Sequence, residues 1–138
     1  MKSISKLCAL FVVLAFTFAS CTKVTNNSST STIIQKGDWK VILFSESGND
    51  HTSNYSAYSF TFNANGTLDA VKSGATTSGT WNTGSDDSQQ KLYINFAGSS
   101  LNELNSDWHI IEKTTTLIKL EDVSGGNGGT DYLTFSKN

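Results

Sequence analysis

Hydrophobic and polar side chains alternate along most of the chain after Gly37. The alternation predicts eight short strands, because successive side chains of a β-strand point to opposite faces of the sheet. The predicted strands cover residues 39–44, 58–62, 67–72, 79–81, 92–96, 108–113, 116–122 and 132–136. One strand about every 12 residues is typical of an antiparallel sandwich or barrel. The pattern therefore predicts an all-β domain.

Two of the segments that connect these strands have sequences that predict a defined local structure. The segment Asn63–Gly66 predicts a tight turn, since Asn and Gly tolerate positive φ angles. The segment Ser100–Glu103 fits a helical capping box and predicts a short helical turn that covers one end of the sheet. A plain loop is the alternative for this second segment.

The first residues of the chain have the pattern of an export signal. Lys2 and Lys6 precede an apolar run of 12 residues, Leu7–Phe18, which small residues follow at Ala19 and Ser20. The run is shorter than the ~20 residues that a membrane-spanning helix needs. These features predict a secretory signal peptide over residues 1–20.

The residues Phe18-Ala19-Ser20-Cys21 resemble a bacterial lipobox, at which a cysteine is acylated and the signal is removed before it. The resemblance implies a lipoprotein with a palmitate-type anchor on Cys21, and more than one acyl chain holds a protein durably on a membrane. Ordinary cleavage, which leaves Cys21 as a free thiol, is the alternative. We expect residues 21–36 to be the acylated cysteine and a flexible tether, because their Ser, Thr and Asn side chains bury little apolar area.

The residue after Cys21 bears on the location of the protein in the cell. The sorting rules of such lipoproteins imply the outer membrane when a residue other than Asp follows the cysteine, and here it is Thr22. Residues 22–25 also lack the acidic side chains of surface-export signals. The resemblance thus implies an anchor in the outer membrane, with the periplasmic face favoured over the cell surface.

Residues 37–138 carry short motifs in a characteristic order. They are Gly37-Asp38-Trp39, Phe60 to Leu68, Gly79-Thr80-Trp81, Leu92 to Phe96, Trp108-His109-Ile110 and Leu133-Thr134-Phe135. Together they resemble the small lipocalin-like domain of exported bacterial lipoproteins, which implies a closed, eight-stranded, up-and-down barrel. Larger lipocalins pair the first Trp with an Arg from a late strand. This chain has no Arg, which leaves Lys119 or Lys137 for that position.

Composition and charge exclude several classes of function. A chain of 138 residues fits one domain, and its formal net charge of −2 argues against a nucleic-acid partner. Its two cysteines, Cys8 and Cys21, leave no disulfide for the folded domain. The two histidines, His51 and His109, lie far apart in sequence and accompany no nucleophile motif. We therefore expect a protein that is not an enzyme and has neither a cofactor nor a metal site.

Two functions remain open. The first is a membrane-anchored binding module for a small apolar or amphipathic ligand. The candidate ligand-lining or core residues are Trp39, Val41, Tyr58, Phe60, Trp81, Ile94 and Trp108. The alternative is a lipoprotein with a filled barrel that contacts an envelope protein complex or a polysaccharide through the loops Gly48–Asn54 and Ser124–Thr130. An eight-stranded barrel has room either for its own side chains or for one small ligand.

Overall fold

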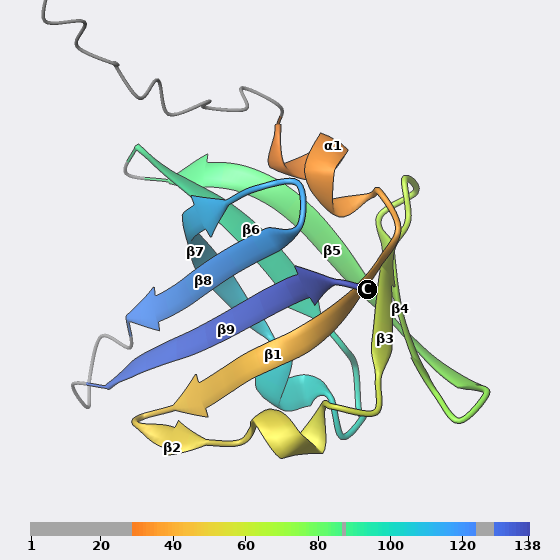
Figure 1. Cartoon of the computed structure of the whole chain (residues 1–138). Coiled ribbons are helices and arrows are strands. Elements are labelled where there is room, and N and C mark those ends of the chain that lie inside the picture. The colour runs from red at the N-terminus through yellow and green to blue at the C-terminus, as the bar shows by residue number, and fades with distance from the viewer. Residues whose placement is uncertain (1–28, 87, 124–128) are drawn as a thin grey trace, which may run out of the picture.

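A computed structural model describes residues 29–86, 88–123 and 129–138 of the chain (Figure 1). The predicted signal peptide, Cys21 and residues 22–28 lie outside the described residues. The elements are α1 (Thr30–Ile34), β1 (Asp38–Glu46), β2 (Asn49–Asp50), η1 (Thr52–Asn54), β3 (Ser59–Phe62), β4 (Thr67–Lys72), β5 (Ala75–Asp86), β6 (Gln89–Asn95), η2 (Asn102–Leu104), β7 (Ser106–Lys113), β8 (Leu117–Val123) and β9 (Thr130–Lys137).

The strands form one antiparallel sheet that closes on itself. The strand order is β2-β1-β3-β4-β5-β6-β7-β8-β9, and a further pairing joins β1 to β9. The short β2 pairs only with the end of β1, so the barrel consists of the other eight strands. This closed, eight-stranded antiparallel barrel confirms the predicted all-β fold class, with β2 as an addition. The predicted turn at Asn63–Gly66 is also present, since the Asn63 carbonyl accepts a hydrogen bond from the Gly66 amide.

One hydrophobic core fills the barrel. Its side chains alternate along the strands with outward-facing ones, so each strand contributes to the core from one face. The buried apolar residues are Ile33, Ile34, Trp39, Val41, Phe44, Tyr55, Phe60, Phe62, Leu68, Ala70, Trp81, Leu92, Ile94, Phe96, Leu101, Leu104, Trp108, Ile118, Leu120, Leu133 and Phe135.

Two strands contain a shift in pairing register that breaks their alternation. In β1 the pairing with β9 shifts register between Val41 and Leu43, which identifies a β-bulge at Ile42. The bulge reverses the phase of the strand: Phe44 is 1% exposed, whereas Leu43 is 39% exposed. Simple alternation from Trp39 through Leu43 therefore assigns the last part of this strand to the wrong face. A second shift, between Ile110 and Glu112 in β7, leaves Ile111 on the outside.

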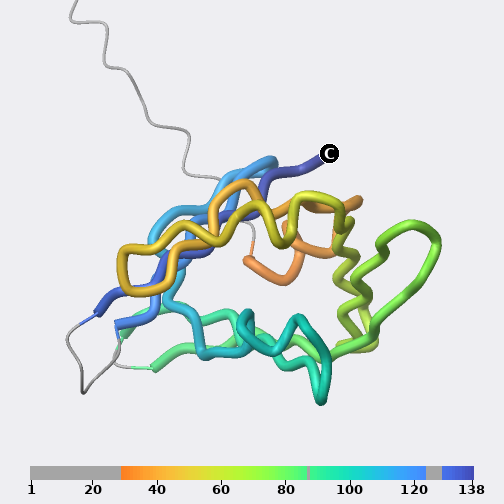
Figure 2. The backbone as a smooth tube through the Cα atoms, turned by 90° about the horizontal axis from the view of Figure 1, so that it is seen from below, coloured from red at the N-terminus to blue at the C-terminus, as the bar shows by residue number. Residues whose placement is uncertain are grey.

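The helix α1 closes one end of the barrel, which we call the α1 end. Viewed along the barrel, the α1 segment lies within the ring of strands (Figure 2). Ile33 and Ile34 are buried, and the Ile34 carbonyl accepts a hydrogen bond of 2.7 Å from the Trp39 indole N–H. Residues 30–34 fall within the segment 21–36 that was expected to be a flexible tether. That expectation is wrong for these residues, because their isoleucines complete the core.

The opposite end, which we call the η end, is closed by η1 and η2. Tyr55 follows η1, Leu104 belongs to η2, and both are buried. The short helical turn predicted near Ser100–Glu103 is present as η2, although the Leu101 amide donates to the Ser99 hydroxyl and no capping box forms. No helix in the described residues is long and apolar enough to cross a membrane.

Of the two lysines considered as partners of the first Trp, Lys137 is the one that lies over its ring. The ammonium group of Lys137, at the end of β9, lies 5.5 Å from the centre of the Trp39 ring. A cation over the face of an indole is attracted by the charge distribution of the ring. Lys119, the other candidate, pairs instead with Glu112 at 2.7 Å.

The burial of α1 leads to a stability prediction that uses two isoleucines. Ile34→Ala should lower the free energy of unfolding by about 2–5 kcal/mol, because it removes buried methylenes and leaves a cavity. Ile42→Ala is the matched control, since Ile42 is 53% exposed, and should cost less than about 1 kcal/mol. Urea unfolding of both variants measures the difference. Equal losses would contradict the role of α1 as part of the core.

Candidate binding site

The residues proposed from the sequence as ligand-lining or core lie mostly inside the barrel. Trp39, Val41, Phe60, Trp81, Ile94 and Trp108 are each 7% exposed or less, and Tyr58 is partly buried against the core. Aromatic rings pack edge to face here, as in the pair Phe62–Trp81 with ring centres 5.5 Å apart. Large side chains thus occupy the space in which a lipocalin-like barrel would hold a ligand.

The three tryptophans use their single polar atom within the protein. The indole N–H of Trp39 donates to the Ile34 carbonyl, that of Trp81 to the Asn63 carbonyl at 2.9 Å, and that of Trp108 to the Leu104 carbonyl at 2.9 Å. A buried indole N–H requires such a partner. Each of these rings therefore fixes a connecting segment at an end of the barrel.

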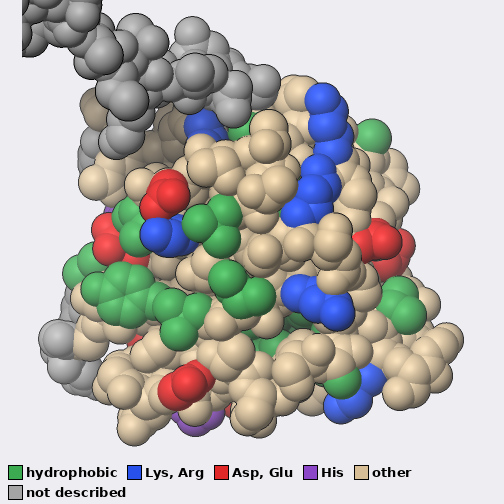
Figure 3. All heavy atoms as spheres, in the orientation of Figure 1, with side chains coloured by type: hydrophobic (Ala, Val, Ile, Leu, Met, Phe, Trp, Pro, Cys, Tyr) green, Lys and Arg blue, Asp and Glu red, His purple; other side chains and the backbone are tan. Residues whose placement is uncertain are grey.

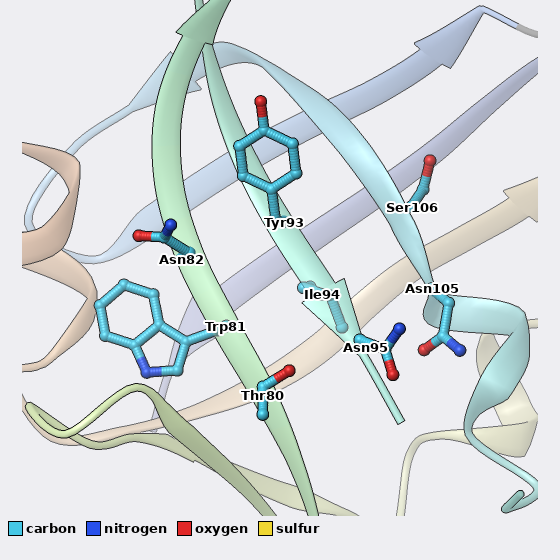
Figure 4. A pocket seen from close by; sticks show the side chains of 8 residues that line it. All are labelled: Thr80, Trp81, Asn82, Tyr93, Ile94, Asn95, Asn105 and Ser106. Atoms are coloured by element: carbon cyan, nitrogen blue, oxygen red, sulfur yellow. The ribbon is translucent and has the colours of Figure 1, made fainter. Parts of the chain in front are cut away.

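A groove on the outer wall of the barrel is the stronger candidate for a binding site (Figure 4). Its volume is about 470 Å³. The residues that line it come from the middle of β5, the end of β6, the residue between η2 and β7, and the start of β7 (Figure 4). They are Thr80, Trp81, Asn82, Tyr93, Ile94, Asn95, Asn105 and Ser106.

The register of β5 and β6 places the polar members of this groove on the outside. Asn82 pairs with Tyr93 and Thr80 with Asn95, and paired residues of an antiparallel sheet share a face. Trp81 and Ile94 lie between them and point into the core. The outer surface of the groove is therefore made of one phenol ring, amides and a hydroxyl.

The Tyr93 ring lies against the backbone of the neighbouring strand. A Cβ atom added at Gly84 would come within 3.0 Å of the ring carbon Cε2 of Tyr93. The glycine thus allows one side of the ring to rest on β5, as aromatic side chains do over strand glycines. Tyr93 remains 37% exposed, so the ring is both supported and accessible to a ligand.

Several polar atoms of the groove are available to a ligand. The described residues make no hydrogen bond with the side chains of Thr80 and Asn95. Asn82 uses only its carbonyl oxygen, which accepts a bond from the Thr83 amide. In contrast, both polar atoms of the Asn105 side chain bind the backbone of Phe96. Its oxygen accepts a hydrogen bond of 2.6 Å from the Phe96 N–H, and its nitrogen donates one of 3.0 Å to the Phe96 carbonyl.

No ionisable side chain other than Tyr93 lines the groove, and a cluster of one lysine and two aspartates lies beside it. Lys91 on β6 contacts Asp107 at 2.6 Å and Asp86 at 3.3 Å. The hydrogen bond from Lys91 lowers the pKa of Asp107, and the bond to Asp107 raises the pKa of Lys91. Lys91 therefore offsets one of these two carboxylates, while the residues that line the groove itself carry no formal charge. The surface is suited to an uncharged polar ligand.

A second depression lies at the η end, between η1, η2 and the end of β4. Its volume is about 460 Å³, and it contains Tyr58, Lys72, Tyr55 and Glu103. The Tyr55 hydroxyl donates to the Glu103 carboxylate at 2.8 Å, and the Lys72 ammonium lies 5.0 Å from the centre of the Tyr58 ring. These polar groups already satisfy one another, so this depression offers a ligand less than the groove does.

The histidines considered in the sequence do not form a site. His51 lies before η1, and its ring centre is 6.2 Å from that of Phe44. His109 is partly buried on β7, opposite Lys91 and Glu121. In the part of the chain that the structure describes, no group of three His, Cys, Asp or Glu side chains is placed to hold a metal ion.

Apolar side chains also gather on the wall formed by β8, β9 and β1 (Figure 3). Ile42 and Leu43 of β1 lie there, with Tyr132 of β9 and Val123 of β8. Tyr132 is 40% exposed, close to the value for Tyr93. It therefore provides a matched reference residue outside the groove.

Comparison with known proteins supports the fold. No family model matches the chain, and no curated protein matches it. The chain is a small antiparallel β-barrel that resembles the crystal structure of a DUF4847 family protein from Bacteroides vulgatus. The two share 19% sequence identity with a TM-score of 0.52, over 80% of this chain and 98% of the other. This likeness concerns the fold.

The buried Tyr55 gives a prediction for alkaline pH. Burial, and then the bond to Glu103, raise the pKa of Tyr55 above its ordinary value of 10.0. The folded protein therefore keeps a proton that the unfolded chain releases, and its free energy of unfolding should fall as the pH rises above 10.0. Tyr55→Phe should flatten this fall. Denaturant unfolding across the alkaline range measures it, and an unchanged slope in the variant would contradict the assignment.

Proposed function

We propose that this protein is a non-enzymatic, lipid-anchored binding module of the bacterial cell envelope that binds a neutral polysaccharide on the outer wall of its barrel. The groove formed by Tyr93, Asn82, Asn95 and Thr80 is the binding surface. The observation that carries the proposal is a supported, accessible aromatic ring among uncharged polar groups.

The filled interior favours this function over the binding of a small apolar ligand inside the barrel. The rings of Trp39, Phe60 and Trp108 are at most 2% exposed, and both ends of the barrel are covered by helical segments. A ligand in the interior would have to displace well-packed side chains, which costs far more than it gains. Recognition is therefore assigned to the outside.

The chemistry of the groove matches that of a sugar chain. A pyranose ring has an apolar face of C–H groups, which can stack on an aromatic ring. Its rim of hydroxyl groups can form hydrogen bonds with side-chain amides. Amides donate and accept hydrogen bonds at once, as hydroxyl groups require. The groove is open along the wall, so a chain of sugars can enter it from the side. This contact does not require the loops Gly48–Asn54 and Ser124–Thr130 that the sequence suggested for it. Residues 124–128 of the second loop lie outside the described part of the chain.

The membrane anchor rests on the lipobox resemblance at Cys21. A polypeptide attached by acyl chains stays on the envelope, where polysaccharides are abundant. The outer membrane, on its periplasmic face, is the location that Thr22 and the residues after it favour.

Substitution of the aromatic platform tests the binding function. Tyr93→Ala should weaken binding to a responsive neutral polysaccharide at least about fivefold, because an aromatic anchor contributes more than about 1 kcal/mol. Tyr132→Ala, which removes an equally exposed tyrosine from another wall, should leave affinity unchanged. Affinity electrophoresis in gels containing dextran, mannan, xylan or starch provides the measurement.

Two results would overturn this function. One is that no neutral polysaccharide in the panel retards the protein. The other is that Tyr93→Ala and Tyr132→Ala weaken binding equally, which would indicate a non-specific effect. Circular dichroism of both variants excludes unfolding as the cause.

The anchor has its own test. In cells, the full chain should partition with membranes and incorporate labelled palmitate, whereas Cys21→Ala should do neither, since its acyl site is gone. Cys8→Ala is the matched control, because Cys8 lies within the predicted signal peptide. Membrane retention that persists in Cys21→Ala would refute the anchor.

A further inference from the structure

The lysines of the barrel are concentrated at the α1 end. Lys36 lies between α1 and β1, Lys40 on the first part of β1, Lys113 at the end of β7 and Lys137 at the end of β9. These elements all start or finish beside α1 (Figure 1). Figure 3 shows most of the lysine side chains of this face in its upper part, toward α1.

These four lysines make no ion pair within the described residues, unlike two other lysines of the barrel. Lys91 is held by Asp86 and Asp107, and Lys119 by Glu112. Lys36 and Lys40 are exposed to solvent. Lys113 donates only to the neutral Thr30 and Gln90 side chains.

Acidic side chains predominate at the η end. Glu46, Asp50, Glu103, Asp122 and Asp131 lie on the strand ends and helical turns there. Lys72, beside Tyr58, is the lysine described at this end. At the α1 end, two described carboxylates lie outside an ion pair: Asp38 accepts a hydrogen bond from Thr61, and Asp69 accepts hydrogen bonds from Asn63 and Ser78. The barrel therefore has a positive and a negative end.

The covalent connection to Cys21 leaves from the positive end. The described chain begins at Ser29, which caps α1, and Thr30 lies beside Lys113. Eight residue steps separate Cys21 from Ser29, and a fully extended chain spans at most about 3.6 Å per step, or about 29 Å. Lys23 lies within this stretch. An acyl group on Cys21 thus holds the α1 end close to the lipid.

We propose that the barrel docks end-on against an anionic lipid surface, with Lys36, Lys40, Lys113 and Lys137 toward the lipid headgroups and the η end outward. This inference rests on the proposed anchor at Cys21. The electrostatic attraction of lysines to anionic headgroups acts within about 10 Å at ordinary ionic strength. The acidic η end is repelled by the same surface, so both ends favour one orientation.

A vesicle-binding experiment tests the charge contribution without the anchor. Residues 21–138 with Cys21→Ala keep every helix, strand and core residue that the structure describes. This protein should bind vesicles of phosphatidylglycerol and phosphatidylcholine, lose binding in high salt, and not bind phosphatidylcholine alone. Lys40→Gln should weaken binding about fivefold. Lys72→Gln, an equal charge change at the η end, should have little effect.

The acylated chain then reports orientation directly. A fluorophore on Thr115→Cys, in the turn between β7 and β8 at the α1 end, should be quenched by brominated lipids. The same label on Ser53→Cys, in η1, should not be quenched. Equal quenching of the two labels, or equal effects of Lys40→Gln and Lys72→Gln, would overturn the end-on orientation.

The two proposals fail in distinguishable ways. If Cys21 carries no acyl chain, palmitate labelling is absent, which refutes the anchor while the vesicle assay still measures the lysines. If the anchor is present but the orientation is wrong, labelling succeeds and the two fluorophores respond alike. Binding to a protein rather than to lipid would appear as an absence of vesicle binding, which also overturns the proposal.

Discussion

The pairing of β1 with β9 is the constraint on which the rest of the structure depends. It closes the sheet at eight strands, and a barrel of this size encloses just enough space for its own side chains or one small ligand. Here tryptophan and phenylalanine side chains take that space. Each buried indole must find an acceptor for its N–H, and the acceptors are carbonyls of α1, of the turn between β3 and β4, and of η2, which all lie at the barrel ends. The tryptophans that fill the barrel therefore also hold the connecting segments at its ends in place.

Side-chain alternation in the sequence is sufficient to place a segment in each of the eight barrel strands, because each strand has one buried and one solvated face. The prediction over residues 79–81 covers only a small part of β5, whose one buried residue is Trp81. Alternation fails where local geometry departs from a regular strand. The bulge at Ile42 brings two neighbouring residues, Ile42 and Leu43, to the outside and returns Phe44 to the core. The helix α1 is five residues long, too short for a helical stripe, and its burial depends on Trp39, which lies beyond it in sequence.

The groove was not predictable from motifs, for a related reason. Its aromatic platform exists because the register of β5 and β6 brings Tyr93 beside Gly84 and opposite Asn82. No spacing within one strand carries that information. Motif-based reasoning chose the tryptophans instead, since they stand out in the sequence. In the fold they are structural, whereas the more accessible Tyr93 has a surface on which a ligand can rest.

The position of the groove and the end-on orientation support each other. Asn95 ends β6 and Asn105 follows η2, so this part of the groove lies toward the η end. With the α1 end at the lipid, the groove stands away from the membrane and remains open to long polymers. Docking through the groove wall would instead cover Tyr93 and set neutral amides against charged headgroups, which offers no electrostatic gain. The two proposals together thus describe a filled barrel that is tethered at its positive end and presents an uncharged recognition surface to the surrounding envelope.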